Sequence, residues 1–571
     1  MKRIINILSI AVIALSAASC MDLSPKAQMS DAQVWSKASN FTLFANQFYG
    51  WTRDFQGADY MSSWSDGVHS DTRSDLVATP NLNVYSAGTN SIPTTDSNYG
   101  THYKRIYYTN LLLKNAESYE AKADIATPMG EAYFFRAYLY FELVQIFGNV
   151  IYTDTPLDMD SEKLYGTRDD RLEVIRHCIS DLQKAVELLP EMPAEDGRVG
   201  KGAANAFLSR VALYEGSWQK FHNANASAAN ELFSIAASAA KAVIDSKAYS
   251  LFYSDALGPR DSYRYMFILE NTDCNPAKLT KADNKEYIFA HRHDEATKKI
   301  GTNITHGAHN SGIYVTRKLA NMYRCQDGLP VAKSPLFQGY GTQNSEFANR
   351  DNRMNGTLLK HGQFYWNNDG KWRTTWTVAD EENALTCDRR SQSGYINYKW
   401  GTERKVDDTN EGYDYPVIRY AEVLLNYAEA VYEQSESITD ADLDYSLNVV
   451  RQRSNPEMVK LSNALVSANG LDMREEIRAE RTVELFLEGF RIDDLKRWKT
   501  AETEMPMDLL GVQMKDTWFA TNWSNQTRPL NGDGCIVLYD GRTWAAKNYL
   551  YPIPSDELQL NPQLGQNNGW N

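Results

Sequence analysis

Apolar residues recur at the spacing of helix turns through most of this chain. Residues 128–147, PMGEAYFFRAYLYFELVQIF, are apolar or aromatic on nearly every face, and a helix of that kind is buried on most sides. Proline suits the first turn of this helix and Gly148 suits its end. Residues 171–189 carry a one-sided apolar stripe that stops at Pro190. The pattern predicts a core helix followed by an amphipathic one.

The same spacing predicts further helices on both sides of these two. We expect them at residues 31–51, 103–121, 197–216, 230–246, 313–323, 415–430 and 443–453. Successive helices form pairs of about 30 to 45 residues, the period of tetratricopeptide-like hairpins. The match to the strict repeat pattern is weak, and Gly202, Ala203 and Ala204 permit close helix packing. The predicted fold is mainly α, a scaffold of degenerate tetratricopeptide-like helical hairpins.

The helical pattern is interrupted by two polar stretches. Residues 52–98 are rich in Asp, Ser, Thr, Asn and Gly, and loops of this length inside a compact domain are usually functional. Residues 251–414 contain a short predicted strand at 286–290, but most of this stretch is irregular. Three prolines near the C-terminus predict a tail that wraps the surface in an extended form.

These changes in pattern divide the chain beyond its leader into three regions. They are an N-terminal helical region, 32–250, which includes the long loop 52–98; a loop-rich ligand-binding subdomain with a few short strands, 251–414; and a C-terminal helical region with its extended tail, 415–571. We expect the loop-rich subdomain to lie on the helical scaffold.

The first residues carry the pattern of an export signal. Two basic residues precede an apolar run, 4–15, that is too short to span a membrane comfortably. Small residues and then Cys20 follow, as in a bacterial lipobox, although Ala17 stands where leucine is usual. We expect a signal peptide over 1–19, acyl chains on Cys20 and a polar tether over 20–31. The alternative is an ordinary signal peptide that ends near a cysteine by chance.

Charge and motif content narrow the chemistry. A net charge of −14 argues against nucleic acid or an anionic membrane surface as a ligand. The sequence contains no P-loop, no Rossmann glycine signature and no GxSxG nucleophile elbow. His291 and His293 could bind a metal from one face of a strand, but we favour a polar loop that happens to contain histidines. We therefore predict no metal site and no cofactor.

The stretch RAERTVELFLEGFRIDDLKRW combines an apolar stripe at helical spacing with charges of both signs. Arg481 and Glu484, and likewise Glu488 and Arg491, are neighbours on a helix. The two glutamates would repel each other unless arginines lie between them. We interpret the charges as a structural network and not as a catalytic pair. Gly489 weakens the helix by about 1 kcal/mol, so we expect it to serve a close approach or a bend.

This stretch resembles the C-terminal signature of the SusD/RagB family. Family-like stretches follow in the family's order over nearly the whole chain: PMGEAYFFRAYLYFELVQIF, GRVGKGAANAFLSRVALYEG, RDNR, IRYAEVLLNYAEA and LYPIPSDELQLNPQLGQNNGW. The resemblance implies a lipoprotein on the outer face of a Gram-negative outer membrane, attached by its lipid anchor alone. Such proteins bind a nutrient such as an oligosaccharide or polysaccharide, and act as a lid on a SusC-like TonB-dependent transporter barrel. We expect no enzymatic activity.

The chemistry of sugars suggests which residues contact the ligand. Tyr and Trp rings pack on the C–H face of a sugar ring, and Asp, Asn and Arg pair with its hydroxyls. Both kinds of residue crowd the polar stretches. The first candidates are Trp64, Asp66, Arg73 and Tyr85, and the second are His309, Tyr314, Trp366, Trp372 and Trp376. For each tryptophan, a role in holding its own loop is the alternative.

Two other functions stay open at this point. A surface glycoside hydrolase would use two carboxylates about 5 to 9.5 Å apart, but the sequence singles out no such pair. A helical-repeat adaptor would bind a protein or peptide. The export signal and the long aromatic loops argue against a cytosolic adaptor, although the lid function is itself a form of protein binding.

Overall fold

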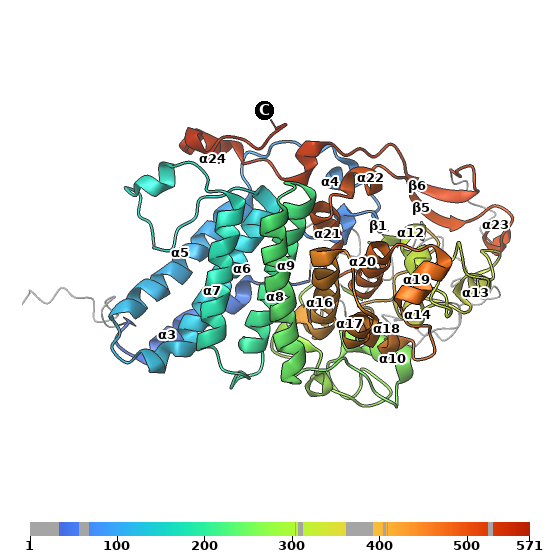
Figure 1. Cartoon of the computed structure of the whole chain (residues 1–571), viewed down its shortest axis with the longest axis horizontal. Helices are drawn as coiled ribbons and strands as arrows, with labels where there is room; N and C mark the ends of the chain where they lie inside the picture. Colours follow the sequence, from blue (N-terminus) through green and yellow to red (C-terminus); the bar gives the residue numbers. More distant parts are fainter. Residues whose placement is uncertain are drawn as a thin grey trace, which may run out of the picture.

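The computed structural model describes residues 34–55, 68–302, 304–305, 312–360, 392–402, 407, 409–522 and 529–570. About half of the chain is helical and its strands are few and short, which confirms the prediction of a mainly α fold. Helices extend along the whole length of the molecule, with the N-terminal ones gathered at one end (Figure 1). Within the described residues, no helix is both long and apolar enough to cross a membrane.

Five long helices form the N-terminal half. They are α5 (Ser97–Ser118), α6 (Ala126–Phe147), α7 (Arg171–Leu188), α8 (Lys201–Phe221) and α9 (Ala226–Ser246). Each packs against the next one along the chain, so that they form successive helical hairpins (Figure 1). This is the scaffold that the helical spacing predicted; three of the predicted boundaries (147, 171 and 246) are the observed ones and the others are shifted by one to six residues.

Local chemistry sets the ends of these helices and the distance between them. Helix α7 begins after Asp170, whose carboxylate accepts a hydrogen bond from the Leu172 N–H at 2.9 Å. Helix α6 ends at Gly148, which has a φ of +75°. Between α8 and α9, a Cβ on Gly216 would lie only 2.9 Å from the ring of Phe233. The glycine therefore allows the close packing that the small residues predicted.

Helix α16 (Tyr420–Ser435) joins the two halves, because it packs against α8 and α9 on one side and α20 (Met473–Glu484) on the other. The prediction of helix from residue 415 is wrong at its start. Residues Tyr415–Arg419 form strand β4, which pairs antiparallel with β2 (Tyr287–His291). All of β4 is buried, so pairing with a strand more than 100 residues away overrides the helical spacing.

Three two-stranded antiparallel sheets are present among the described residues. Besides β2 and β4, β1 (Val77–Ala78) pairs with β3 (Tyr314–Val315), and β5 (Leu509–Gln513) pairs with β6 (Cys535–Tyr539). The predicted helix over 313–323 thus begins as a strand, and its helical part is only α12 (Arg317–Met322).

Short helices complete the fold. They are α3 (Ala38–Ala45), α4 (Val84–Ala87), α10 (Gly258–Tyr265), α13 (Gln343–Phe347), α14 (Asn352–Thr357), α17 (Asp440–Tyr445), α18 (Leu447–Ser454), α19 (Asn463–Asn469), α21 (Arg491–Arg497), α22 (Ala501–Glu504), α23 (Trp518–Asn522) and α24 (Ser555–Leu560). Single 3-10 turns are η1 (Asn46–Trp51), η2 (Asp71–Arg73), η3 (Lys122–Ile125), η4 (Glu162–Tyr165), η5 (Met266–Ile268), η6 (Lys281–Asp283), η7 (Ala546–Tyr549) and η8 (Pro562–Leu564).

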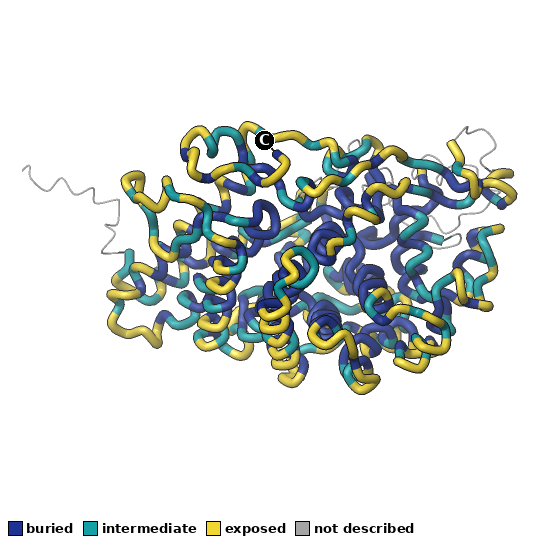
Figure 2. Tube along the Cα trace, turned by 45° about the horizontal axis from the view of Figure 1, so that its top comes forward, coloured by how far each residue is buried: buried dark blue, intermediate teal, exposed yellow. Residues whose placement is uncertain are grey.

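The described part of the long polar stretch, residues 68–98, differs from the expected surface loop. Residues 69–78 are buried, as are most segments in the interior of the molecule, while exposed segments lie mainly at its edges (Figure 2). Their polar groups pair with residues far along the chain: Asp75 binds Arg491 at 2.8 Å, and Asp71 accepts a hydrogen bond from the Leu487 N–H at 2.6 Å. These partners are more than 400 residues away in sequence. The composition of the stretch therefore gave no sign that it is buried, and indicated a loop.

The C-terminal tail is less extended than predicted. It contains η7, α24 and η8, and Ile553 and Trp570 are buried. The Tyr551 N–H donates to the carbonyl of Ile146 at 2.8 Å. The tail therefore packs into the end of the N-terminal helices and does not only lie on the surface.

Candidate functional site

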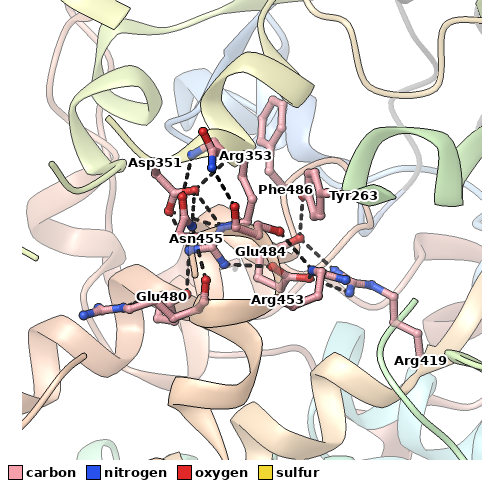
Figure 3. Close-up of polar contacts among 12 residues, drawn as sticks. Tyr263, Asp351, Arg353, Arg419, Arg453, Asn455, Glu480, Glu484 and Phe486 are labelled. Carbon is pink, nitrogen blue, oxygen red and sulfur yellow. Dashed lines mark hydrogen bonds and ion pairs between the residues drawn. The ribbon is translucent and has the colours of Figure 1, made fainter. Parts of the chain in front are cut away.

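The charged residues of the signature stretch form a buried network (Figure 3). Glu484 accepts hydrogen bonds from Arg353 at 2.8 Å, Arg419 at 2.7 Å and Arg453 at 2.5 Å. Burial alone would raise the pKa of Glu484, but the three guanidiniums outweigh it and hold the pKa well below its usual range. Every partner of this carboxylate is a structural cation, so Glu484 is not poised for catalysis.

Glu488 belongs to the same network. Arg419 lies between the two glutamates, because its Nε donates to Glu488 at 2.7 Å while another nitrogen binds Glu484. Lys399 donates to Glu488 at 2.6 Å. The predicted arginine between the glutamates is confirmed, but the predicted pairs along the helix are wrong: Arg481 binds Asp494 at 2.8 Å instead. The chain turns after α20, so distant segments supply the partners.

Gly489 makes that turn possible. It adopts a φ of +77°, and a Cβ at this position would lie 3.1 Å from the carbonyl oxygen of His69. Leu487, two residues earlier, also has a positive φ of +58°. The prediction that Gly489 serves a bend and a close approach is confirmed.

Two of the predicted ligand-contact residues, Arg73 and Tyr85, lie together. The guanidinium of Arg73 is 3.5 Å from the centre of the Tyr85 ring, and Arg73 also donates to the hydroxyl of Tyr551. The Tyr85 and Tyr551 rings stack with centroids 5.0 Å apart. The cavity beside them measures about 10 Å³, which holds about one water and no sugar ring. In this structure the cluster is packed, and ligand contact by Arg73 and Tyr85 stays a prediction.

Of the other candidates, one is a buried residue and six lie outside the described residues. Tyr314 lies in β3 and is 5% exposed, so its ring contributes to the packing of the small β1–β3 sheet. The remaining candidates lie outside the described residues; these are Trp64, Asp66, His309, Trp366, Trp372 and Trp376. Their contacts with a ligand stay predictions, as does the lipidation of Cys20.

The described residues that border the candidate segments share one part of the molecule. Phe55, which precedes residues 56–67, packs its ring edge against Trp400 at 5.0 Å and Tyr413 at 5.7 Å between centroids. The hydroxyl of Thr305 lies 3.5 Å from that of Tyr413. Two of the three candidate segments therefore begin at a common aromatic cluster.

The third candidate segment starts beside them. Tyr314, close after residues 306–311, forms a β-bridge with Ile396. The Leu359 N–H, just before residues 361–391, donates to the carbonyl of Ile396 at 2.8 Å. Residues next to all three segments thus contact Ile396, Trp400 or Tyr413.

A hollow among the described residues lies elsewhere, between α5 and the C-terminal tail. It has a volume of about 410 Å³, within the usual range for small-molecule sites. Tyr107 and Tyr165 line it and are 40% and 49% exposed. Glu557 also lines this groove, and burial raises the pKa of its carboxyl. Sequence reasoning missed this groove, because its walls are brought together from three separate segments.

Two buried carboxyls have the raised pKa expected of a catalytic acid. Burial raises the pKa of Asp71 to about 7 and that of Glu411 to about 7. Asp71 is 3% exposed and Glu411 is 1% exposed. Neither is among the residues that line the hollow beside α5.

Comparison with known proteins identifies the family. The model of the SusD family matches residues 281–570, about half of the chain. The chain belongs to the SusD family. A second model, described as starch-binding associating with outer membrane, matches residues 21–213. Together these matches agree with the family that the sequence motifs suggested.

Individual relatives extend this SusD-family assignment over most of the chain. SusD-like protein P2 of Formosa agariphila is 27% identical over 443 residues, covering 77% of this chain and 73% of the relative. A SusD-like carbohydrate binding protein of Bacteroides fragilis is 24% identical, with a TM-score of 0.72 over 93% of this chain and 100% of that one. Surface glycan-binding protein A of Bacteroides fluxus is 18% identical, with a TM-score of 0.61 over 94% of this chain and 100% of that one. The structural matches establish a shared fold.

Proposed function

We propose that this SusD-family chain is a non-catalytic glycan-binding lipoprotein of the outer membrane. It is held by acyl chains on Cys20, faces the exterior, and passes oligosaccharide or polysaccharide to a SusC-like TonB-dependent transporter. The family match over residues 281–570 carries the proposal. Two of the structurally similar proteins, a carbohydrate binding protein of Bacteroides fragilis and a surface glycan-binding protein of Bacteroides fluxus, support the ligand class.

The glycan site is proposed at the three candidate segments. Trp64, Trp366, Trp372 and Trp376 would supply platforms for sugar rings, because indole and phenol rings pack well on apolar C–H faces. Asp66 and His309 would pair with hydroxyls, and Arg73, Tyr85 and Tyr314 remain further candidates for ligand contact. The shared attachment of the three segments near Trp400 supports this choice over sites scattered on the surface.

Affinity electrophoresis against a polysaccharide panel tests the proposal. Wild-type protein should be retarded by at least one glycan, and the triple variant Trp366→Ala, Trp372→Ala, Trp376→Ala should lose at least about tenfold in affinity, since stacking losses of about 1 kcal/mol each add up. The matched control is Tyr107→Ala with Tyr165→Ala, which removes two exposed rings from the α5 groove. If only the control weakens binding, the groove is the glycan site. Retardation by no glycan, or release of cleaved sugar, contradicts the proposed function.

The transporter partner needs a separate experiment. The chain should co-purify with a barrel protein from detergent-solubilised outer membranes of its own host. A Cys20→Ser variant should remain unlipidated and be lost from the membrane fraction. Recovery of the variant in the membrane at the wild-type level would contradict the lipid anchor.

A further inference from the structure

Three metal-ligating side chains converge beside the β2–β4 sheet. His291 ends β2 and His293 follows two residues later, so both rings face the same side, with centroids 5.2 Å apart. The Asp54 carboxylate bridges them: its Oδ1 lies 2.7 Å from Nε2 of His293 and its Oδ2 lies 3.4 Å from Nε2 of His291. One ligand atom from each residue lies within 4.8 Å of the others.

The backbone that carries these histidines is held firmly. The His293 N–H donates to Asp414 at 2.9 Å, and the Lys281 ammonium donates to the His293 carbonyl at 2.5 Å. Both histidines are buried, at 8% and 6% exposure. The expectation of a polar loop that happens to hold histidines does not describe this place, because the rings are fixed on a buried strand and its continuation.

Hydrogen bonds orient His291 as a metal ligand. Lys298 Nζ lies 3.1 Å from Nε2 of His291. An ammonium has only donors, so Nε2 must carry the lone pair and Nδ1 the proton. That proton points to Thr52 Oγ1, 3.0 Å away. A metal-ligating histidine is normally held in this way, with its other nitrogen donating to a neighbouring oxygen.

His293 is free to change its tautomer. Its Nε2 faces the Asp54 carboxylate and therefore carries the proton in the neutral ring. Its Nδ1 is buried and has no hydrogen-bond partner. Moving the proton to Nδ1 would break only the bond to Asp54, and coordination would replace that bond.

We propose that Asp54, His291 and His293 form a binding site for a divalent transition-metal ion of the zinc class. Two imidazole nitrogens and one carboxylate oxygen are ligands that such ions prefer. Tetrahedral bonds of about 2.0 to 2.2 Å require the ligand atoms to stand about 3.3 Å apart, which small side-chain shifts achieve. The fourth position faces solvent beside Asp54, whose side chain is 33% exposed.

Lys298 competes with the ion for this site. Its ammonium contacts the lone pair of His291 that would coordinate the metal, but the residue is exposed and can swing into solvent. The bound metal would join residues 52–55 to β2, two segments separated by more than 230 residues. This inference does not depend on the proposed glycan function.

Isothermal titration of the EDTA-treated full chain with zinc chloride tests the site. Wild-type protein should bind one ion at this site, and Asp54→Asn and His291→Gln should each weaken that binding at least tenfold. Lys298→Met should strengthen it about tenfold, because the competing ammonium is gone. Lys299→Met, an exposed lysine one residue away, is the matched control and should leave affinity unchanged.

Cobalt replaces zinc in a second readout. The visible absorption of Co²⁺ bound to wild-type protein should report four-coordinate geometry and should disappear in Asp54→Asn, while the circular dichroism of the variant stays native. Absence of binding in both wild type and Lys298→Met overturns the proposal. Binding that survives unchanged in Asp54→Asn and His291→Gln also overturns it, because the ion would then sit at other histidines.

Discussion

The two halves of the molecule bury charge in different ways. In the N-terminal helices, buried charges form small groups inside an apolar and aromatic core: Arg136 binds Asp181 at 2.7 Å through two nitrogens, and Glu142 binds Arg53 at 2.8 Å and His102 at 3.0 Å. In the C-terminal half, Glu484 alone binds three arginines that come from three different segments (Figure 3). In the N-terminal half the charges lie within a core that is mainly apolar. In the C-terminal half the charged network itself fills part of the interior.

This difference shows what holds each half together. Helices that follow one another in sequence need only apolar faces and small residues to pack. The C-terminal half must bring together loops, a strand and helices that are far apart in the chain, and multidentate arginines fix their relative positions. A buried network of this kind adds little net stability, but the loss of one member is costly because its partners remain charged and buried.

The strongest test of this contrast is Glu484→Gln. It should lower the free energy of unfolding by about 4 to 5 kcal/mol, the upper end for a broken buried pair, since three buried guanidiniums each lose one of their carboxylate partners. Urea unfolding followed by circular dichroism measures the change. Glu475→Gln, whose side chain is 66% exposed beside Arg478, is the control and should change stability by less than about 1 kcal/mol. Equal effects at the two sites would mean that the network is not structural.

The next largest expected effect is a pH dependence of the folding stability that arises from the buried residue Asp71. Burial raises the pKa of Asp71 to about 7, so the folded state keeps this proton after the unfolded chain has released it near pH 4. The stabilising contribution of protonated Asp71 is therefore complete below about pH 4 and is lost as pH rises through 7. Asp71→Asn should gain up to about 4 kcal/mol relative to wild type between pH 4 and pH 8, since one pKa unit is about 1.4 kcal/mol.

Denaturant titrations at several pH values measure this relative gain. The comparison with wild type is needed because acids that are paired with arginine make stability depend on pH in the opposite direction. Burial alone would raise the pKa of Glu429, but the Arg497 guanidinium outweighs burial and lowers this pKa to about 2. Asp124→Asn replaces an exposed acid and is the control. A stability difference between Asp71→Asn and wild type that stays flat from pH 4 to pH 8 would contradict the raised pKa.

The same contrast explains how far the sequence predicted the fold. The long N-terminal helices agree with the prediction to within a few residues, because apolar spacing, Pro190 and Gly148 are all local signals. The C-terminal half was predicted less well. Strand β4 was assigned to a helix because its partner β2 is far along the chain, and Arg481 was paired with Glu484 because the turn at Gly489 was not fully anticipated.

The candidate site was harder to predict than the fold. Ligand contact by Arg73 stays a prediction, but the packing of Arg73 against Tyr85 and Tyr551 could not be predicted, because Tyr551 lies almost 480 residues away in sequence. The groove beside Tyr107 and Tyr165 was not predicted, because its walls come from separate segments that meet only in the folded state. The paired histidines were noticed, but nothing local to them revealed that Asp54 and Thr52 would complete their surroundings.

Gly489→Ala tests the turn between α20 and α21, the two helices of the signature stretch. It should cost about 2 kcal/mol, because alanine is strained at a positive φ and its Cβ would press on the His69 carbonyl at 3.1 Å. Gly541→Ala, at a φ of +66° with open space around it, isolates the backbone strain and should cost about 1 kcal/mol. Thermal unfolding of both variants measures the difference. If the two changes cost the same, the approach of His69 contributes nothing.

The smallest expected effect comes from the apolar half. Ile175→Val removes one methyl group from a fully buried position in α7 and should cost about 1 kcal/mol. Since no charge is uncovered, this cost should be the same at pH 5 and pH 8 and at low and high salt, as urea titrations under the four conditions would show. The Glu484→Gln variant is the comparison, because its loss of stability arises from buried guanidinium charges that have lost a carboxylate partner. A strong dependence of the Ile175→Val effect on pH or salt would mean that the helical half is also governed by its charges, and the distinction between the two halves would fail.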